Sequence, residues 1–180
     1  MRLYVVRHGI AEEEPPKGGD DGARRLTPQG RARLRRIGRA LRRLEARVDA
    51  LVTSPLARAA ETAAILVDAH GKLPAPVVCA ELAQGVAPLT TVRALASYAR
   101  RGDLMIVGHE PGLSRVVAVL LTGSPDGVAI ELKKGGCALL ELDRLAPRHA
   151  RLVWSCPPRV LRLAGRKKKP KRQWGSTPPG

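Results

Sequence analysis

The sequence predicts an α/β protein with three layers, in which a mostly parallel central sheet is flanked by helices. Short apolar runs rich in β-branched residues alternate along the chain with segments of helical periodicity, and this alternation is typical of a parallel sheet with crossover helices. The chain has 180 residues, enough for one compact domain with a hydrophobic core. That length leaves little material for a large cap insertion over the sheet.

The elements follow one another from the amino terminus. Thr27-Pro28 and Ser54-Pro55 each supply a helix N-cap and a proline for the first helical turn. Gly102 is expected to end a later helix. Strands are expected in residues 3–6, 49–55, 76–82, 103–112, 127–132, 137–142 and 150–155. Helices are expected in residues 28–47, 56–70, 90–101 and 113–121.

The composition changes near residue 165. Residues 1–164 are predicted to form one domain, whereas residues 165–180 are basic, rich in Pro and Gly and without periodicity, which predicts a disordered tail. The formal net charge is +16. Such a charge indicates either a solvated basic surface or attraction to an anionic partner, which could be an acidic protein, a phosphorylated substrate, nucleic acid or polyphosphate. The tail is one place where a polyanion could bind.

Several classes of protein are disfavoured by the same composition. The three cysteines lie far apart without a C-x-x-C motif, which favours reduced thiols in a cytoplasm over disulfides or a zinc site. The chain has no Phe, two Trp and two Tyr, and so few aromatics argue against modules that stack single-stranded nucleic acid. No apolar run resembles a signal segment or approaches the roughly 18 residues of a membrane span. We therefore expect a soluble, cytoplasmic protein with no membrane contact.

Charged side chains follow three of the predicted strands. Arg7 and His8 follow the first strand, Arg58 lies one turn into the helix after the second, and His109 follows a later strand. Arg24 lies on the loop that returns to the same edge. One such His or Arg is usually structural, but ligands bind outside the carboxyl ends of parallel strands. Two histidines and several arginines brought to that edge therefore predict a functional site.

Arginine-rich sites of this kind suit a phosphoryl group. Guanidinium forks make bidentate contacts to phosphoryl oxygens, and helix amino termini add backbone N–H donors. No G-x-x-x-x-G-K-[ST] loop is present, which excludes a nucleotide triphosphatase of that kind. His8 and His109 lie among arginines, which would repel a metal cation. We expect a phosphoryl-transfer site with no metal and no cofactor, in which a histidine is the nucleophile.

Three blocks of sequence carry a resemblance to a known family. Arg7-His8-Gly9, "TSPLARAAETA" (53–63) and "VGHEP" (107–111) resemble the motifs of the histidine phosphatase superfamily, which has the phosphoglycerate-mutase-like fold. "RRLTPQG" (24–30) and "WSCPPRVLRL" (154–163) are similar to the SixA-type phosphohistidine phosphatase branch of that family.

The resemblance implies a role for each site residue. His8 would be the catalytic nucleophile that becomes phosphorylated. Arg7 and Arg58 would bind the phosphoryl oxygens and act in catalysis. His109 would donate to the transferring group and stabilise charge in the transition state, and Arg24 would be a further phosphate-binding arginine.

Other charged residues near the site are assigned different roles. Many relatives use a carboxylic acid to protonate an alkoxide leaving group, and Glu81 is the candidate for this role. A phosphohistidine substrate weakens the need for it, because imidazole is a far better leaving group than an alkoxide. Glu12, Glu13 and Glu14 are expected to form a solvated loop, and Arg25 is expected to be a bystander.

Three functional hypotheses remain open from the sequence. The first is a SixA-type phosphatase that acts on phosphohistidine in a protein. The second is a phosphatase for a small phosphomonoester. The third, from another class, is a basic polyanion-binding protein for which the fold is a platform.

Overall fold

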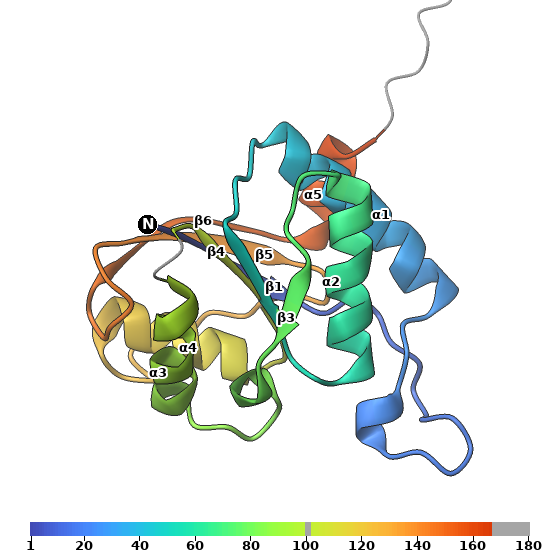
Figure 1. The fold of residues 1–180 in the computed structure, drawn as a ribbon, viewed down its shortest axis with the longest axis horizontal. Helices are drawn as coiled ribbons and strands as arrows, with labels where there is room; N and C mark the ends of the chain where they lie inside the picture. The colour runs from blue at the N-terminus through green and yellow to red at the C-terminus, as the bar shows by residue number, and fades with distance from the viewer. Residues whose placement is uncertain (100–101, 167–180) are drawn as a thin grey trace, which may run out of the picture.

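The computed structural model describes residues 1–99 and 102–166, with a six-stranded sheet at the centre (Figure 1). The strands are β1 (Arg2–Arg7), β2 (Ala50–Thr53), β3 (Pro76–Val78), β4 (Leu104–Gly108), β5 (Cys137–Leu142) and β6 (Ala150–Cys156). They lie in the order β3-β2-β4-β1-β5-β6. The four strands from β3 to β1 pair in parallel, and β5 and β6 pair antiparallel. The predicted α/β class with a mostly parallel sheet is confirmed.

Helices cover both faces of this sheet (Figure 1). They are α1 (Pro28–Arg43), α2 (Ala57–His70), α3 (Pro88–Ala99), α4 (Gly112–Thr122) and α5 (Pro158–Ala164), with short 3₁₀ turns η1 (Asp21–Ala23) and η2 (Ala80–Leu82). Leu34, Leu66 and Leu161 place α1, α2 and α5 in one apolar cluster. Leu95 and Val117 place α3 and α4 in a second cluster on the opposite face. The sheet therefore has a separate core on each side, as a three-layer fold requires.

Helix α1 begins as the sequence predicts and ends earlier. Thr27 is the N-cap, its hydroxyl oxygen accepts a hydrogen bond from the backbone N–H of Gly30 at 2.9 Å, and Pro28 stands in the first turn. The helix ends at Arg43 rather than near residue 47. Glu45 has a φ of 52°, and this left-handed conformation cannot continue a right-handed helix.

The prediction of a strand in residues 127–132 is wrong. This segment is irregular in the structure, and Val128 is 37% exposed. The edge of β1 that such a strand could have joined pairs with β5 instead. The segment is anchored by side chains, because the backbone N–H of Leu132 donates to Oε1 of Glu110 at 3.0 Å and its carbonyl accepts from Arg7 at 2.7 Å.

Helix α5 was not expected from the sequence. It packs against α1 through Leu161, which is 1% exposed. Arg39 donates to the carbonyl of Gly165 at 3.2 Å, and Arg43 donates to the carbonyls of Ala164 and Arg166. These contacts satisfy carbonyls at the carboxyl end of the helix, where a positive charge is favourable. The predicted disordered tail, from residue 167 onward, lies outside the described residues.

The parallel register determines where the functional residues meet. Arg7 pairs with Gly108 across β1 and β4, and Thr53 pairs with Val107 across β2 and β4. The three strands therefore end at the same level, and the segments that follow them begin side by side. Within the described residues, no helix combines the length and the apolar character needed to cross a membrane.

Gly30 offers a test of how tightly α1 is docked beside the segment after β1. A Cβ at this position would lie 2.2 Å from the carbonyl oxygen of Ile10, so we expect Gly30→Ala to lower the free energy of unfolding by about 1–3 kcal/mol. The measurement is urea unfolding followed by circular dichroism. Gly112→Ala is the matched control, because a Cβ there would meet nothing within 4 Å. An equal loss in both variants would show that the close approach at Gly30 is unimportant.

Candidate active site

The two predicted histidines lie side by side at the carboxyl edge of the sheet. His8 follows β1 and His109 follows β4, and their ring centroids are 5.0 Å apart. The backbone N–H of His8 donates to the carbonyl of Gly108 at 3.0 Å. Both rings are buried, with 6% of His8 and 3% of His109 exposed. The structure thus brings together two side chains that lie about a hundred residues apart in the sequence.

His8 is held in one tautomer by its own neighbour. Its Nδ1–H donates to the carbonyl oxygen of Gly9 at 2.7 Å, because a carbonyl can only accept. This leaves the lone pair on Nε2. Burial is the main cause that lowers the pKa of His8 to about 3; the bond to Gly9 opposes it, and the nearby His109, Arg58 and Arg7 act in the same direction as burial. The ring is therefore neutral near pH 7, with Nε2 available as a nucleophile.

A chain of hydrogen bonds ties the segment after β1 to α2. The backbone N–H of Gly9 donates to the hydroxyl oxygen of Thr62 at 3.0 Å, and the Thr62 hydroxyl donates to the carbonyl of Arg58 at 2.6 Å. Gly9 is also in close contact with α1, because a Cβ there would lie 2.7 Å from Cδ1 of Leu34. The position of His8 is therefore fixed relative to the first turn of α2.

Arg58 lies in that first turn and is wholly buried, at 0% exposed. Its Nη1 donates to the carbonyl of Asp21 at 2.8 Å, and its Nη2 donates to Oδ2 of Asp21 and Oε1 of Gln84, both at 3.0 Å. Arg7 donates through Nη1 to the carbonyl of Leu132 at 2.7 Å. Both guanidinium groups are thus anchored by their Nη atoms.

His109 is anchored by a serine that the sequence assigned to another role. Its Nε2 lies 2.8 Å from the hydroxyl of Ser54. We expected Ser54 to be the N-cap of α2, but the N-cap is Leu56, so that prediction is wrong. Ser54 instead follows β2 at the level of β4 and meets His109 there. Burial first and then the charge of Arg58 lower the pKa of His109 to about 4, while Asp21 opposes them.

The site contains polar atoms that have no partner in the protein. Among the described residues, four buried side-chain nitrogens make no hydrogen bond, and three of them are Nε of Arg7, Nε of Arg58 and Nδ1 of His109. The fourth belongs to His70, on the far end of α2. A buried donor without an acceptor costs about 1–3 kcal/mol. Three such atoms around a neutral His8 indicate a binding site for an oxygen-rich anion.

The loop before α1 brings Arg24 to the site together with a residue that the sequence analysis missed. Arg24 donates through Nε to Oδ1 of Asp21 at 2.7 Å and through Nη1 to the carbonyl of Glu12 at 2.8 Å. Asp21 therefore joins Arg24 to Arg58. Its position could not have been found from the sequence, because it depends on the conformation of an irregular loop. Arg25, by contrast, is exposed.

Glu81 lies near the site as an ionised carboxylate. It lines a small cavity together with His109. The thiol of Cys79 donates to its Oε2 at 3.2 Å, and this bond lowers the pKa of Glu81. A carboxyl group with a lowered pKa is deprotonated near pH 7 and has no proton to give to a leaving group. Glu12, Glu13 and Glu14 are exposed.

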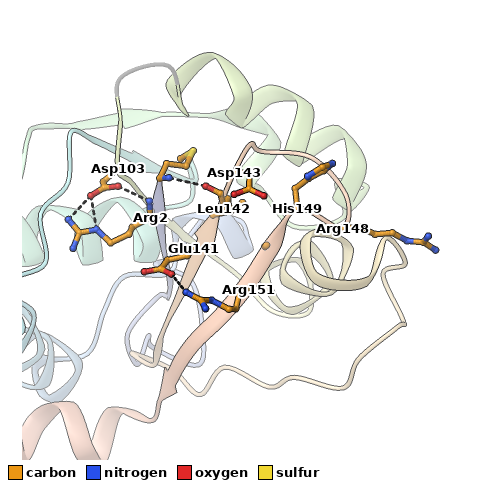
Figure 2. Close-up of a pocket in the computed structure, with 10 residues that line it drawn as sticks. Arg2, Asp103, Glu141, Leu142, Asp143, Arg148, His149 and Arg151 are labelled. Atoms are coloured by element: carbon orange, nitrogen blue, oxygen red, sulfur yellow. Dashed lines mark hydrogen bonds and ion pairs between the residues drawn. The ribbon is translucent and has the colours of Figure 1, made fainter.

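A second polar cavity of about 600 Å³ lies at the opposite edge of the sheet (Figure 2). Four of its charged side chains are paired with one another: Arg2 with Asp103 at 2.6 Å, and Arg151 with Glu141. None of the buried unpartnered nitrogens in the described part of the chain belongs to its lining. The unsatisfied donors that favour anion binding are therefore found at the carboxyl edge.

Comparisons with known proteins specify the class to which this fold and site belong. The model of the histidine phosphatase superfamily (branch 1) matches residues 3–83. An uncharacterized protein from Picosynechococcus sp. is 34% identical over 143 residues, which are 76% of this chain and 82% of that protein. An uncharacterized protein from Mycobacterium tuberculosis is 34% identical over 129 residues, 69% of this chain and 75% of that protein. The chain belongs to the histidine phosphatase superfamily.

Solved structures agree with this fold. The protein histidine phosphatase SixA complexed with tungstate has a TM-score of 0.78 at 22% identity, covering 89% of this chain and 99% of that chain. The α-ribazole phosphatase from Shigella flexneri has a TM-score of 0.67 at 18% identity, covering 88% and 97%. The phosphoserine phosphatase from Entamoeba histolytica in complex with phosphoserine has a TM-score of 0.65 at 13% identity, covering 87% and 97%.

The lowered pKa of His8 makes a prediction for stability against pH. Below the unfolded value of about 6.5 the unfolded chain binds a proton that the folded chain excludes, so this residue destabilises the fold as the pH falls toward about 3. The free energy of unfolding of the wild type should fall between pH 7 and pH 5. In His8→Asn we expect this fall to be smaller by about 1–2 kcal/mol. Chemical unfolding at both pH values measures the difference.

His149→Asn is the control, because His149 is only partly buried and lies at the opposite edge of the sheet. We expect it to leave the pH dependence of the wild type unchanged. A pH dependence of His8→Asn equal to that of the wild type would contradict a buried, neutral His8.

Proposed function

We propose that this protein is a metal-independent phosphatase that forms a phosphohistidine intermediate on His8 and removes the phosphoryl group from phosphohistidine in a protein. The observation that carries the proposal is the set of unpartnered nitrogens of Arg7, Arg58 and His109 beside a histidine with a free Nε2. Two N–H donors of buried guanidinium groups suit the oxygens of a phosphoryl group. Cations so close to both histidines oppose the binding of a metal ion.

In the first step, Nε2 of His8 attacks phosphorus and the bond to the leaving group breaks. When the substrate is a phosphorylated imidazole, the electron pair of its P–N bond goes to the ring nitrogen, and a neutral imidazole departs if the ring carries a proton on its other nitrogen. The charge on the transferring group is spread over three oxygens. Arg7 and Arg58 are fixed beside it in advance, and such preorganised charges are the main source of catalysis in phosphoryl transfer.

In the second step, water attacks the phosphorus of phosphorylated His8. The P–Nε2 bond breaks, its electron pair returns to Nε2, and inorganic phosphate leaves. The bond from Nδ1 to the carbonyl of Gly9 keeps the ring in place through both steps. The nitrogen that attacks in the first step is thus the leaving atom in the second, and one orientation of His8 serves both.

The P–N substrate is favoured over a phosphomonoester by the state of Glu81. An alkoxide leaving group needs a proton, and the lowered pKa of Glu81 leaves this carboxylate without one. No large insertion covers the carboxyl edge on the side of β3, since only residues 79–87 separate β3 from α3. A site with little covering it suits a phosphorylated side chain on the surface of a protein, whereas a small phosphomonoester remains the alternative substrate.

Trapping the phosphoenzyme tests this proposal. We expect a phosphohistidine peptide to leave an acid-labile, base-stable phosphate on the protein, and we expect His8→Ala to lower turnover by at least about a thousandfold because the nucleophile is lost. The readout is release of phosphate together with mass spectrometry of the phosphorylated peptide.

His149→Ala, at a partly buried position on the opposite edge of the sheet, is the control and should keep wild-type turnover. Full activity of His8→Ala would rule out the assigned nucleophile. Faster hydrolysis of para-nitrophenyl phosphate or sugar phosphates than of the phosphohistidine peptide would favour the small phosphomonoester.

A separate observation keeps polyanion binding as a second candidate function. Burial lowers the pKa of Arg162 on α5, and so do the charges of Arg33, Arg36, Arg159 and Arg166. Within the described residues, none of these five arginines forms an ion pair with a carboxylate. We call them the arginine face; it lies where α1 and α5 pack together (Figure 1). Its uncompensated charge would attract a polyanion.

The arginine face predicts salt-dependent binding to duplex DNA or polyphosphate. We expect the double variant Arg36→Glu/Arg162→Glu to weaken binding at least tenfold at low salt and to reduce the slope of log affinity against log salt by about two. Arg93→Glu/Arg115→Glu is the control, because both arginines are exposed on α3 and α4, across the sheet, and the net charge changes by the same amount. Equal weakening of binding by both variants would mean that only the net charge matters. An affinity that does not change with salt concentration would exclude this function.

A further inference from the structure

Asp21 makes more contacts with the arginines of the candidate site than any catalytic step described above requires. Its Oδ1 accepts from Nε of Arg24 at 2.7 Å, and its Oδ2 accepts from Nη2 of Arg58 at 3.0 Å. Its backbone carbonyl accepts from Nη1 of Arg58 at 2.8 Å. One carboxylate thus bridges Arg58, which the proposed function assigns to the phosphoryl group, and Arg24, which the family resemblance implies as a further phosphate-binding arginine.

The local fold does not need this carboxylate. Asp21 opens the short turn η1, but the cap of that turn is Asp20, whose Oδ1 accepts from the backbone N–H of Ala23 at 3.1 Å. The side chain of Asp21 is 58% exposed, whereas that of Arg58 is 1% exposed. The ion pair therefore joins an accessible anion on a loop to a buried cation, so solvent and ligands can reach it from the side of Asp21.

The carboxylate stands where a second anion would compete with it. The free nitrogens of Arg7, Arg58 and His109 belong to the same group of side chains, and the negative charge of Asp21 also acts on His109. A phosphoryl dianion bound there would share Arg58 with Asp21 or displace it. In either case the carboxylate lowers the positive potential that the dianion meets.

We propose that Asp21 is an internal counter-ion of the phosphate subsite and determines its specificity by weakening the binding of free anions. This inference rests on the proposed function of the site. Inorganic phosphate and small phosphomonoesters have only the phosphoryl group with which to compete against Asp21. A phosphorylated protein gains further binding energy from contacts of its surface, so it can compete with Asp21 for the arginines. The phosphate product lacks those contacts and therefore dissociates readily.

The test is calorimetric titration with inorganic phosphate at pH 7.5 and low ionic strength, which needs no turnover. We expect Asp21→Asn to lower the dissociation constant for phosphate about three- to tenfold relative to the wild type, because one nearby negative charge is removed. The difference should shrink at high salt. Asp20→Asn is the matched control, since it removes a charge from the neighbouring position without touching either arginine, and it should stay within about twofold of the wild type.

The possible results separate the two proposals. If phosphate binds the wild type and Asp21→Asn with equal affinity, the role of Asp21 is overturned, while the proposed function still stands. An equal gain in Asp20→Asn would overturn it as well, because the effect would then come from net charge. No phosphate binding to the wild type or to either variant would overturn the proposed function and this inference with it. If Asp21→Asn unfolds below the temperature of the titration, Asp21→Ser takes its place under the same criteria.

Discussion

The buried guanidinium group of Arg58 is the constraint on which the rest of the site depends. A charge with no exposed surface is tolerated only when polar groups surround it, because an ion removed from water without hydrogen-bond partners is costly. Asp21 and Gln84 supply those groups from two different loops. The first turn of α2 therefore cannot be fixed independently of the loop before α1 or of the segment after β3. Arg58 links all three to the position of His8 through Thr62.

The same charge sets the chemistry of the histidines. Burial is the main cause of the lowered pKa of both His8 and His109, and Arg58 contributes in the same direction for each. A neutral His8 has a lone pair for attack, and neutral rings do not add to the positive charge that the arginines already supply. In the proposed function, binding and nucleophilicity therefore come from one arrangement: the arginines that would attract a phosphoryl group also help burial to keep His8 deprotonated.

The sequence was informative wherever the backbone alone decides a position. Arg7 and His109 could be assigned to one edge because parallel strands end together, and the register of β1 with β4 bears this out. It was uninformative wherever a contact depends on the course of a loop. Asp21 meets the site residues through an irregular loop, so no periodicity or spacing pointed to it. Ser54 follows β2 directly, but the sequence predicted it to be a helix N-cap and not a partner of His109. Helix α5 was not predicted from the sequence, because its seven residues are too few to form a stable helix without packing on α1.

Two populations of arginine in this chain are held in opposite ways, and the difference bears on selectivity. Arg7 and Arg58 are anchored through their Nη atoms and keep Nε without a partner, so their donors are already oriented for one small group. The arginines of the arginine face lie near one another without carboxylate partners in the described part of the chain, so they attract anions of any shape. Only the first arrangement distinguishes a phosphoryl group from a diffuse negative charge. The counter-ion Asp21 sharpens this distinction, because an anion must exchange hydrogen bonds with Arg58 rather than merely approach it.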